Sequence, residues 1–216
     1  MNESPTRDTL PASRPVRFRG SRLAVAALRL IGWRVAFDGF PTRQGVAIVY
    51  PHTSNWDFIV MVLAKWAIGV PARWWGKDSL FRVPLLGRWM RWLGGMPLVR
   101  HSPRGAVGEM VAAFDEARAA DGLLWLGLSP EGTRRRTPGW RSGFYQVACG
   151  ASVPLACVRL DYGRKTVDLT QFLSLTGDPA LDYPRIAAAY EGVRGLRADQ
   201  ASPVQPLPKP VKADTV

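Results

Sequence analysis

Cysteine, histidine and acidic residues are scarce in this sequence, and it has no long hydrophobic run. The only two cysteines, Cys149 and Cys157, lie in apolar surroundings without the spacing of a zinc site, so we expect two reduced core residues. Neither a disulfide framework nor a metal centre is indicated. The two most apolar segments, 21–34 and 58–69, are interrupted by arginine or lysine and are shorter than the roughly 20 apolar residues of a membrane-spanning helix.

The shortage of acidic residues leaves the chain strongly basic. Asp and Glu number 17 against 29 Lys and Arg, which gives a formal net charge of +12. Three classes of acidic partner suit such a charge: nucleic acid, anionic lipid and a phosphorylated substrate. The sequence contains no signature of a nucleic-acid-binding fold, so we predict a lipid or a phosphorylated substrate and no nucleic acid.

The two ends of the chain differ in composition from its middle. Residues 1–20 are rich in Pro, Ser, Thr and Arg and lack the apolar core of a secretory signal, so we expect a disordered leader. Residues 197–216 are Pro-rich and polar, which predicts a disordered tail. The hydrophobic content of 47% suits a single folded domain over residues 21–196.

A histidine and an aspartate follow the β-branched apolar run 46–50 at a spacing of four intervening residues. The imidazole of His52 is suited to taking a proton from a hydroxyl near neutral pH, and the Asp57 carboxylate can hold it in one tautomer. Five positions along one continuous helix would place the two side chains on different faces. They can meet if Ser54 caps a helix that begins at Asn55, with the histidine on the incoming loop.

The same residues also allow a purely structural interpretation. Residues 54–57 form a variant of the capping box, in which Asp57 accepts hydrogen bonds from backbone donors and His52 is an ordinary loop residue. Two further segments favour the catalytic interpretation. Residues 123–134 run from an apolar strand into a polar, Gly-containing loop that ends in arginine, and residues 94–100 are a short apolar run closed by arginine. Binding sites form at such strand ends in α/β sheets.

Strand-like and helix-like segments alternate along the chain, which predicts an α/β fold with a mixed central sheet flanked by helices. The expected strands cover residues 46–50, 73–77, 94–100, 123–128, 153–160 and 165–170. The expected helices cover residues 21–34, 55–69, 89–93, 103–120, 141–150 and 182–195.

Four sequence blocks, in this order, resemble the motifs of the glycerolipid acyltransferases of the lysophosphatidic acid acyltransferase type. The first motif, a histidine and an aspartate separated by four residues, matches residues 52–57, and the second, an apolar strand closed by a basic residue, matches residues 95–100. The third, Pro-Glu-Gly-Thr-Arg, matches residues 130–134, and the fourth, an apolar strand around a proline, matches residues 153–157. One departure is Pro51, where many members of the family carry asparagine.

The resemblance implies the α/β sandwich of that family and an O-acyltransferase activity. A fatty acyl group would move from acyl-CoA or acyl carrier protein to a lysophospholipid hydroxyl, with 1-acylglycerol-3-phosphate, giving phosphatidic acid, as the first candidate acceptor. His52 would be the general base and Asp57 its orienting partner, while Arg100 and Arg134 would hold the acceptor's phosphate. The further residues predicted to bind substrate or shape its loop are Glu131, Gly132, Thr133 and Lys77. A thioester is already activated, so no cofactor or metal is implied.

Two alternatives to this function stay open. One is an acyltransferase for another lysolipid, such as a lyso-aminolipid without phosphate. The other is a non-catalytic protein that binds a membrane surface and uses the same scaffold. His101, which adjoins Arg100, competes with His52 for the role of base, although a surface histidine is the commoner outcome.

Aromatic and basic residues in the first half of the chain predict contact with an anionic membrane. Six of the nine tryptophans lie between residues 56 and 92, where their rings suit a membrane interface or a large aromatic core. The helix expected at 21–34 carries Arg22, Arg29 and Trp33 beside an apolar face, which suits an interfacial helix or one that packs on the domain. We therefore expect a peripheral or monotopic protein at the cytoplasmic face of a membrane.

Overall fold

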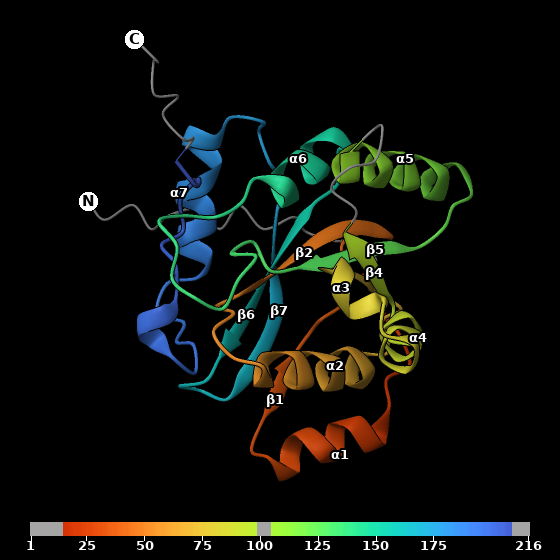
Figure 1. Cartoon of the computed structure of the whole chain (residues 1–216), viewed down its shortest axis with the longest axis vertical. Helices are drawn as coiled ribbons and strands as arrows, with labels where there is room; N and C mark the ends of the chain where they lie inside the picture. Colours follow the sequence, from red (N-terminus) through yellow and green to blue (C-terminus); the bar gives the residue numbers. More distant parts are fainter. Residues whose placement is uncertain (1–14, 99–104, 209–216) are drawn as a thin grey trace.

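A seven-stranded sheet forms the centre of the molecule and has helices on both faces (Figure 1). The computed structural model describes residues 15–98 and 105–208. The strands are β1 (Arg34–Ala36), β2 (Gln44–Tyr50), β3 (Arg73–Lys77), β4 (Gly95–Leu98), β5 (Leu124–Leu128), β6 (Leu155–Asp161) and β7 (Thr166–Leu173). The helices are α1 (Arg22–Leu30), α2 (Trp56–Ile68), α3 (Asp78–Phe81), α4 (Pro84–Trp92), α5 (Gly105–Ala119), α6 (Gly143–Gly150), α7 (Pro179–Ala189) and the 3-10 helix η1 (Ala198–Gln200).

The strands follow the order β1-β7-β6-β2-β5-β3-β4, and all neighbours run parallel except β6 and β7. The predicted mixed sheet flanked by helices is therefore confirmed. Strand β1 was not predicted. It has three residues and pairs with β7, which begins at Thr166, so a periodic pattern in the local sequence could not have indicated it.

The central strands β2 and β5 each contribute to two cores, because successive side chains point to opposite faces. Val46 and Ile48 of β2 enter the core beneath α5, α6 and α7, whereas Ala47 enters the core beneath α1 and α2. Strand β5 alternates in the same way, with Leu126 in the first core and Trp125 in the second. Figure 1 shows α5 and α6 on one side of the sheet and α1 and α2 on the other. Burial on both faces explains why these strands are nearly continuous apolar runs.

Parts of both predicted disordered ends belong to the folded structure. In the leader, the backbone of Val16 exchanges hydrogen bonds of 2.8 and 2.9 Å with Phe40. In the tail, residues 197–208 are hydrogen-bonded to the segment around Trp140 and include η1. Proline loses little conformational freedom on folding, so a Pro-rich segment can dock in an extended form at low cost. The expectation of disorder is wrong for these stretches, and the remainder of both ends lies outside the described residues.

Gly45 and Gly127 lie on neighbouring strands and differ in the space around them. A Cβ atom on Gly45 would lie 2.3 Å from the ring of Trp125, which is fully buried and stacked on Phe40. A Cβ atom on Gly127 would meet nothing closer than 3.6 Å. We expect Gly45→Ala to lower the free energy of unfolding by about 1–3 kcal/mol, because the indole has no room to move aside. Gly127→Ala should leave it unchanged or raise it slightly. Urea denaturation measures both, and equal losses would contradict this account.

Candidate active site

Three strands end side by side at one edge of the sheet, because β6, β2 and β5 are adjacent and parallel. His52 follows β2, Glu131 follows β5 and Tyr162 follows β6. Two of these residues come from separate sequence motifs, and the topology brings them together with a third. The carboxyl edge of parallel strands is where α/β folds bind their ligands, so this edge is the candidate active site.

The turn between His52 and α2 is organised by the carboxylate of Asp57. Its Oδ2 atom accepts hydrogen bonds from the backbone N–H groups of Thr53 at 2.7 Å and Ser54 at 2.8 Å. In return, the Ser54 hydroxyl accepts a hydrogen bond of 3.2 Å from the backbone N–H of Trp56, where α2 begins. As the structural interpretation predicts, Asp57 accepts hydrogen bonds from backbone donors of the turn. The helix, however, begins at Trp56, and its N-cap residue Asn55 makes no side-chain cap hydrogen bond. The expected helix start at Asn55 with Ser54 as its cap is therefore one residue too early.

The catalytic interpretation depends on the same carboxylate. Nδ1 of His52 lies 3.1 Å from Oδ2 of Asp57, and the aspartate side chain is 1% exposed while that of the histidine is 22% exposed. An imidazole held through Nδ1 leaves Nε2 as the nitrogen that can accept a proton from a substrate hydroxyl. The turn before α2 and the histidine–aspartate pair therefore depend on the same carboxylate, and the two interpretations do not exclude each other.

Asp57 is ionised although it is buried. Burial raises the pKa of a carboxyl group, but hydrogen bonds from His52, from the hydroxyl of Tyr162 and from the backbone of Ser54 outweigh it and hold the pKa of Asp57 below its usual value. Its position in the first turn of α2 adds the favourable field of the helix dipole. An ionised carboxylate at this point can stabilise a positive charge on the imidazole ring.

The buried side chain of Glu131 connects two backbone segments through hydrogen bonds. It is 1% exposed, and its Oε2 and Oε1 atoms accept hydrogen bonds from the backbone N–H groups of His52 at 2.7 Å and Ser202 at 2.9 Å. Burial raises the pKa of its carboxyl group, although these backbone donors act in the opposite direction. The residue was predicted among those that bind substrate or shape the loop. Its contacts fit the shaping of the loop, because the carboxylate is buried and each oxygen accepts a hydrogen bond from the backbone.

The rest of the third motif forms the loop after β5. Gly132 has a φ of +64°, and a Cβ atom there would lie 2.7 Å from the side chain of Arg141, so the turn requires glycine. The hydroxyl of Thr133 accepts a hydrogen bond from the backbone N–H of Arg135 at 3.3 Å. Arg134 is exposed, and it forms no ion pair with any carboxylate of residues 15–98 or 105–208. Of these residues, Arg134 is the exposed cation, and its predicted role in binding phosphate stays a prediction.

Lys77 and Arg100 complete the predicted set. Lys77 is the exposed last residue of β3, which is separated from β2 by β5 alone, so its backbone lies roughly 10 Å from the end of β2. Arg100 lies outside the described residues. The structure therefore joins His52, Asp57 and Glu131 through direct contacts and places Lys77 along the same edge, two strands away.

Two residues of this site, Tyr162 and Ser202, were not predicted. Tyr162 comes two residues after the largely apolar run 153–160, so the strand-end pattern would have indicated this region if applied there. Ser202 gave no signal, because it lies in the Pro-rich tail. Its hydroxyl accepts a hydrogen bond from the backbone N–H of Thr137, and its carbonyl accepts one from the hydroxyl of Tyr50. The tail is therefore part of the support of the site.

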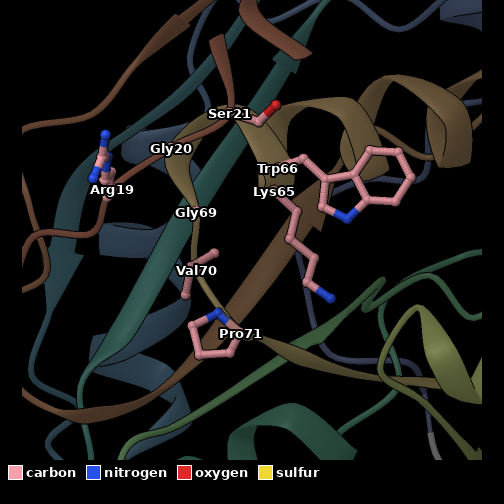
Figure 2. Close-up of a pocket in the computed structure, with 8 residues that line it drawn as sticks. All are labelled: Arg19, Gly20, Ser21, Lys65, Trp66, Gly69, Val70 and Pro71. Atoms are coloured by element: carbon pink, nitrogen blue, oxygen red, sulfur yellow. The ribbon is translucent and has the colours of Figure 1, made fainter. Parts of the chain in front are cut away.

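A surface pocket of about 450 Å³ lies at the opposite end of α2, where the segment before α1 crosses it (Figure 2). Its lining includes Arg19, Lys65 and Trp66. The ammonium group of Lys65 donates a hydrogen bond of 2.6 Å to the carbonyl of Leu93, and burial lowers its pKa. Helix α2 has 13 residues, so this pocket lies roughly 20 Å from His52 and is separate from the candidate active site.

A histidine held by a buried carboxylate at the carboxyl edge of an α/β sheet has the geometry that general base catalysis requires. A family model described as Acyltransferase matches residues 34–161, which is more than half of the chain and includes the pair and the third motif. The chain belongs to this acyltransferase family.

Comparison with solved structures finds a similarity to the 1-acyl-sn-glycerophosphate acyltransferase PlsC from Thermotoga maritima. The two are 19% identical with a TM-score of 0.44, and the match covers 69% of this chain and 65% of that one. The match thus spans less than two thirds of the PlsC chain. No curated protein matches this sequence.

Replacement of Asp57 by asparagine separates the two roles of the carboxylate. The amide oxygen of Asp57→Asn can still accept the hydrogen bonds from Thr53 and Ser54, so we expect the turn and the fold to persist. The loss of charge removes the group that stabilises an imidazolium, and we expect acyl transfer to slow by about 10³–10⁴-fold. Steady-state kinetics with circular dichroism measure the two effects, and an active variant would contradict the assigned role.

The stability of the same variant should depend on pH differently from that of the wild type. The pKa of Asp57 is lower in the folded protein than in the unfolded chain, so its stabilising effect is present above about pH 4 and is lost as the pH falls through the folded-state value. Asp57→Asn lacks this titration, so its free energy of unfolding should fall less steeply under acid conditions. Denaturant unfolding across this range tests the expectation, and parallel curves would refute it.

Proposed function

We propose that this protein is an O-acyltransferase that moves a fatty acyl group from an acyl thioester to a hydroxyl of a lysophospholipid. The proposed acceptor is 1-acylglycerol-3-phosphate and the product is phosphatidic acid, with acyl-CoA or acyl carrier protein as the donor. The observation that carries the proposal is the contact between Nδ1 of His52 and the buried, ionised carboxylate of Asp57. Membership of the acyltransferase family supplies the reaction class.

His52 is the general base in the proposed reaction. Its Nε2 takes the proton of the acceptor hydroxyl while the hydroxyl oxygen forms a bond to the carbonyl carbon of the thioester. The carbon–sulfur bond then breaks, and the leaving thiolate recovers the proton from the imidazolium. Asp57 stabilises the positive charge between these steps. No acyl-enzyme forms, and positioning with base catalysis suffices because the thioester is already activated.

The arginine-rich loop after β5 supports an acceptor that carries phosphate. Residues 134–136 are three consecutive exposed arginines, and a guanidinium group matches phosphate oxygens with two parallel hydrogen bonds. The loop is anchored beside the base, because Glu131 accepts a hydrogen bond from the backbone of His52 at 2.7 Å. In the proposal, Arg134 binds the acceptor's phosphate with Arg100, and Lys77 assists from the same edge of the sheet.

Replacement of the base tests this proposal. His52→Ala should abolish thiol release from the acyl donor and leave the fold intact, because the side chain lies on a loop and is 22% exposed. The melting temperature should fall only modestly, since the buried Asp57 carboxylate loses one of its donors and keeps the others. His101→Ala is the matched control, since His101 is the only other histidine in the sequence, and it should retain turnover. The assay measures thiol release from acyl-CoA and from acyl carrier protein with a panel of lysolipids.

Each alternative gives a different result in this assay. Turnover by His52→Ala near the wild-type value would overturn the mechanism. Faster reaction with lyso-aminolipids than with 1-acylglycerol-3-phosphate would replace the proposed acceptor. Binding to vesicles without thiol release by the wild type would identify a non-catalytic membrane-surface protein on this scaffold.

We also propose that the protein binds the cytoplasmic face of a membrane, as a peripheral or monotopic protein, through the outer faces of α1, α2 and α4. On α4, Leu85, Trp89 and Trp92 follow each other at spacings of four and three residues and therefore share one face. On α1, Leu23 and Leu30 lie seven residues apart. Except for Trp89, these side chains are more than 70% exposed. A helix on a water-facing surface turns polar residues outward, so two outward apolar stripes indicate an apolar partner.

The exposed apolar stripes of α1, α2 and α4 lie next to one another and form one surface. The ring of Trp66 on α2 lies 5.8 Å from that of Trp92 on α4, and α1 packs along α2 (Figure 1). Residues 15–98 contain twelve arginines and lysines but three aspartates, one of which is the buried Asp57, so the surroundings favour anionic lipid. None of the helices in the described part of the chain has both the length and the hydropathy of a membrane span.

The segment 21–34 has one face that packs on the domain and one face that is exposed. Ala24 and Leu28 are buried, as a domain-packing helix requires, while the opposite face of α1 remains available for lipid. Trp33 was expected to border the apolar face of this helix. It is instead 5% exposed and packs edge-on against Tyr162, so it belongs to the core.

A triple variant tests the proposed membrane surface. Replacement of Leu23, Leu30 and Trp92 by serine should weaken binding to vesicles containing phosphatidylglycerol by more than about tenfold, because three exposed apolar anchors are lost. Leu181→Ser is the matched control, since Leu181 is 59% exposed on α7, which covers the other face of the sheet. Vesicle cosedimentation measures both, and unchanged binding of the triple variant, or an equal loss in the control, would contradict the proposal.

A further inference from the structure

The second oxygen of the Asp57 carboxylate has a partner that the proposed mechanism does not use. Oδ2 faces His52 and the backbone N–H groups of the capping turn, whereas Oδ1 accepts a hydrogen bond of 2.6 Å from the hydroxyl of Tyr162. Within the described residues, no other donor bonds to Oδ1. Tyr162 therefore completes the hydrogen bonding of the buried carboxylate.

The side chain of Tyr162 is held in one position. The residue directly follows β6, the parallel neighbour of the strand that leads to His52, and its backbone N–H donates a hydrogen bond of 2.8 Å to the carbonyl of Arg194. Its ring packs edge-on against Trp33, with centroids 4.8 Å apart and ring planes at 88°. Because Trp33 is itself buried, the tyrosine hydroxyl is directed to a fixed point.

The hydroxyl remains a donor at neutral pH, since burial and the neighbouring Asp57 both raise the pKa of Tyr162. A donor bonded to one carboxylate oxygen withdraws negative charge from the group as a whole. The charge that remains on Oδ2 governs how strongly Asp57 stabilises a proton on the imidazole of His52. A change at Tyr162 is therefore transmitted to the base through the carboxylate.

We propose that Tyr162 is a positioning residue of this site: its hydroxyl fixes the orientation of Asp57 and, through Asp57, sets the proton affinity of His52. Tyr162 need not touch either substrate for this role. The kinetic consequences rest on the proposed acyl transfer, whereas the effect on the histidine is independent of any substrate.

Tyr162→Phe tests the inference, because it removes the hydroxyl and keeps the ring that packs against Trp33. The chain has two histidines, so an NMR titration of the histidine side chains follows two signals, and His52→Ala assigns them. Loss of the donor leaves more charge on Asp57, so the titration midpoint of His52 should move to higher pH by about 0.5–1 unit.

The pH dependence of catalysis by Tyr162→Phe should shift in the same direction as the His52 midpoint. The acid limb of the pH profile of kcat/KM should therefore move to higher pH. We expect kcat to fall about tenfold at pH 7, with the KM for donor and acceptor within about twofold of the wild type. A loss of packing alone would not move the pH profile.

Tyr145→Phe is the matched control, because it breaks a tyrosine–aspartate bond in the core on the other face of the sheet. The hydroxyl of Tyr145 donates a hydrogen bond of 2.7 Å to Asp182, which is 0% exposed. This variant should lose thermal stability and keep the wild-type midpoint and pH profile.

The outcomes separate the inference from the proposed function. An unmoved His52 midpoint in Tyr162→Phe, or an equal shift in Tyr145→Phe, would overturn the inference. A shifted midpoint in a protein that transfers no acyl group would support the inference and overturn the proposed function.

Discussion

The buried carboxylate of Asp57 is the group on which the geometry of the site depends. Two backbone N–H groups, the imidazole of His52 and the hydroxyl of Tyr162 converge on its two oxygens. An isolated carboxylate in this position would lose several kcal/mol of hydration free energy, and only such a set of donors can compensate for that loss. The start of α2 and the orientation of the base are consequently set by one group. A displacement of the first turn of α2 would displace the imidazole with it.

A second buried carboxylate, that of Glu131, accepts a hydrogen bond from the backbone N–H of the histidine. Asp57 holds the ring of His52, and Glu131 holds its backbone N–H. The remaining oxygen of Glu131 is bonded to Ser202, whose carbonyl accepts a hydrogen bond from Tyr50 of the strand that leads to the histidine. The C-terminal segment around Ser202 is thus hydrogen-bonded both to the loop after β5 and to the end of β2, on either side of His52. The two side chains in this set of contacts, Glu131 and Tyr50, are not exposed, so the contacts do not depend on a flexible surface side chain.

The sequence predicts the proposed reacting groups better than the residues that hold them in place. His52, Asp57 and the third motif are recognisable because short motifs of fixed spacing follow apolar strands. The hydroxyl of Tyr162 reaches Asp57 across 105 residues, and Ser202 meets Glu131 across 71, so no local pattern connects these residues. The role of Glu131 depends on its burial, which a motif does not reveal.

In the fold, too, the elements with a local sequence pattern are predicted, and those that depend on contacts with distant residues are not. Alternation of strands and helices predicts the mixed sheet, because each long strand has a continuous apolar signal. Strand β1 is too short for such a signal and exists through its pairing with β7. Composition alone misjudged residues 197–208, since a Pro-rich segment lacks apolar periodicity yet can add backbone hydrogen bonds to a surface that is already formed. Trp33 was likewise assigned from the character of its helix, whereas its burial is set by Tyr162 beyond β6.

Helix α2 connects the proposed reaction site with the proposed membrane surface. Its buried side, with Val60, Ala64 and Ile68, packs on the core beneath α1 and α2. Its outer side carries Trp56, Ile59 and Trp66, all at least 36% exposed, with a spacing that keeps them on one face of the helix. This apolar stripe begins beside the capping turn of the histidine and ends at the tryptophans of α4. If the acceptor is a lysolipid held at the proposed membrane surface, this stripe offers it apolar contact over roughly 20 Å, from that surface to the turn that carries His52. The extra apolar exposure of α2, which would be a liability in water, has a physical reason if the substrate arrives from a lipid surface.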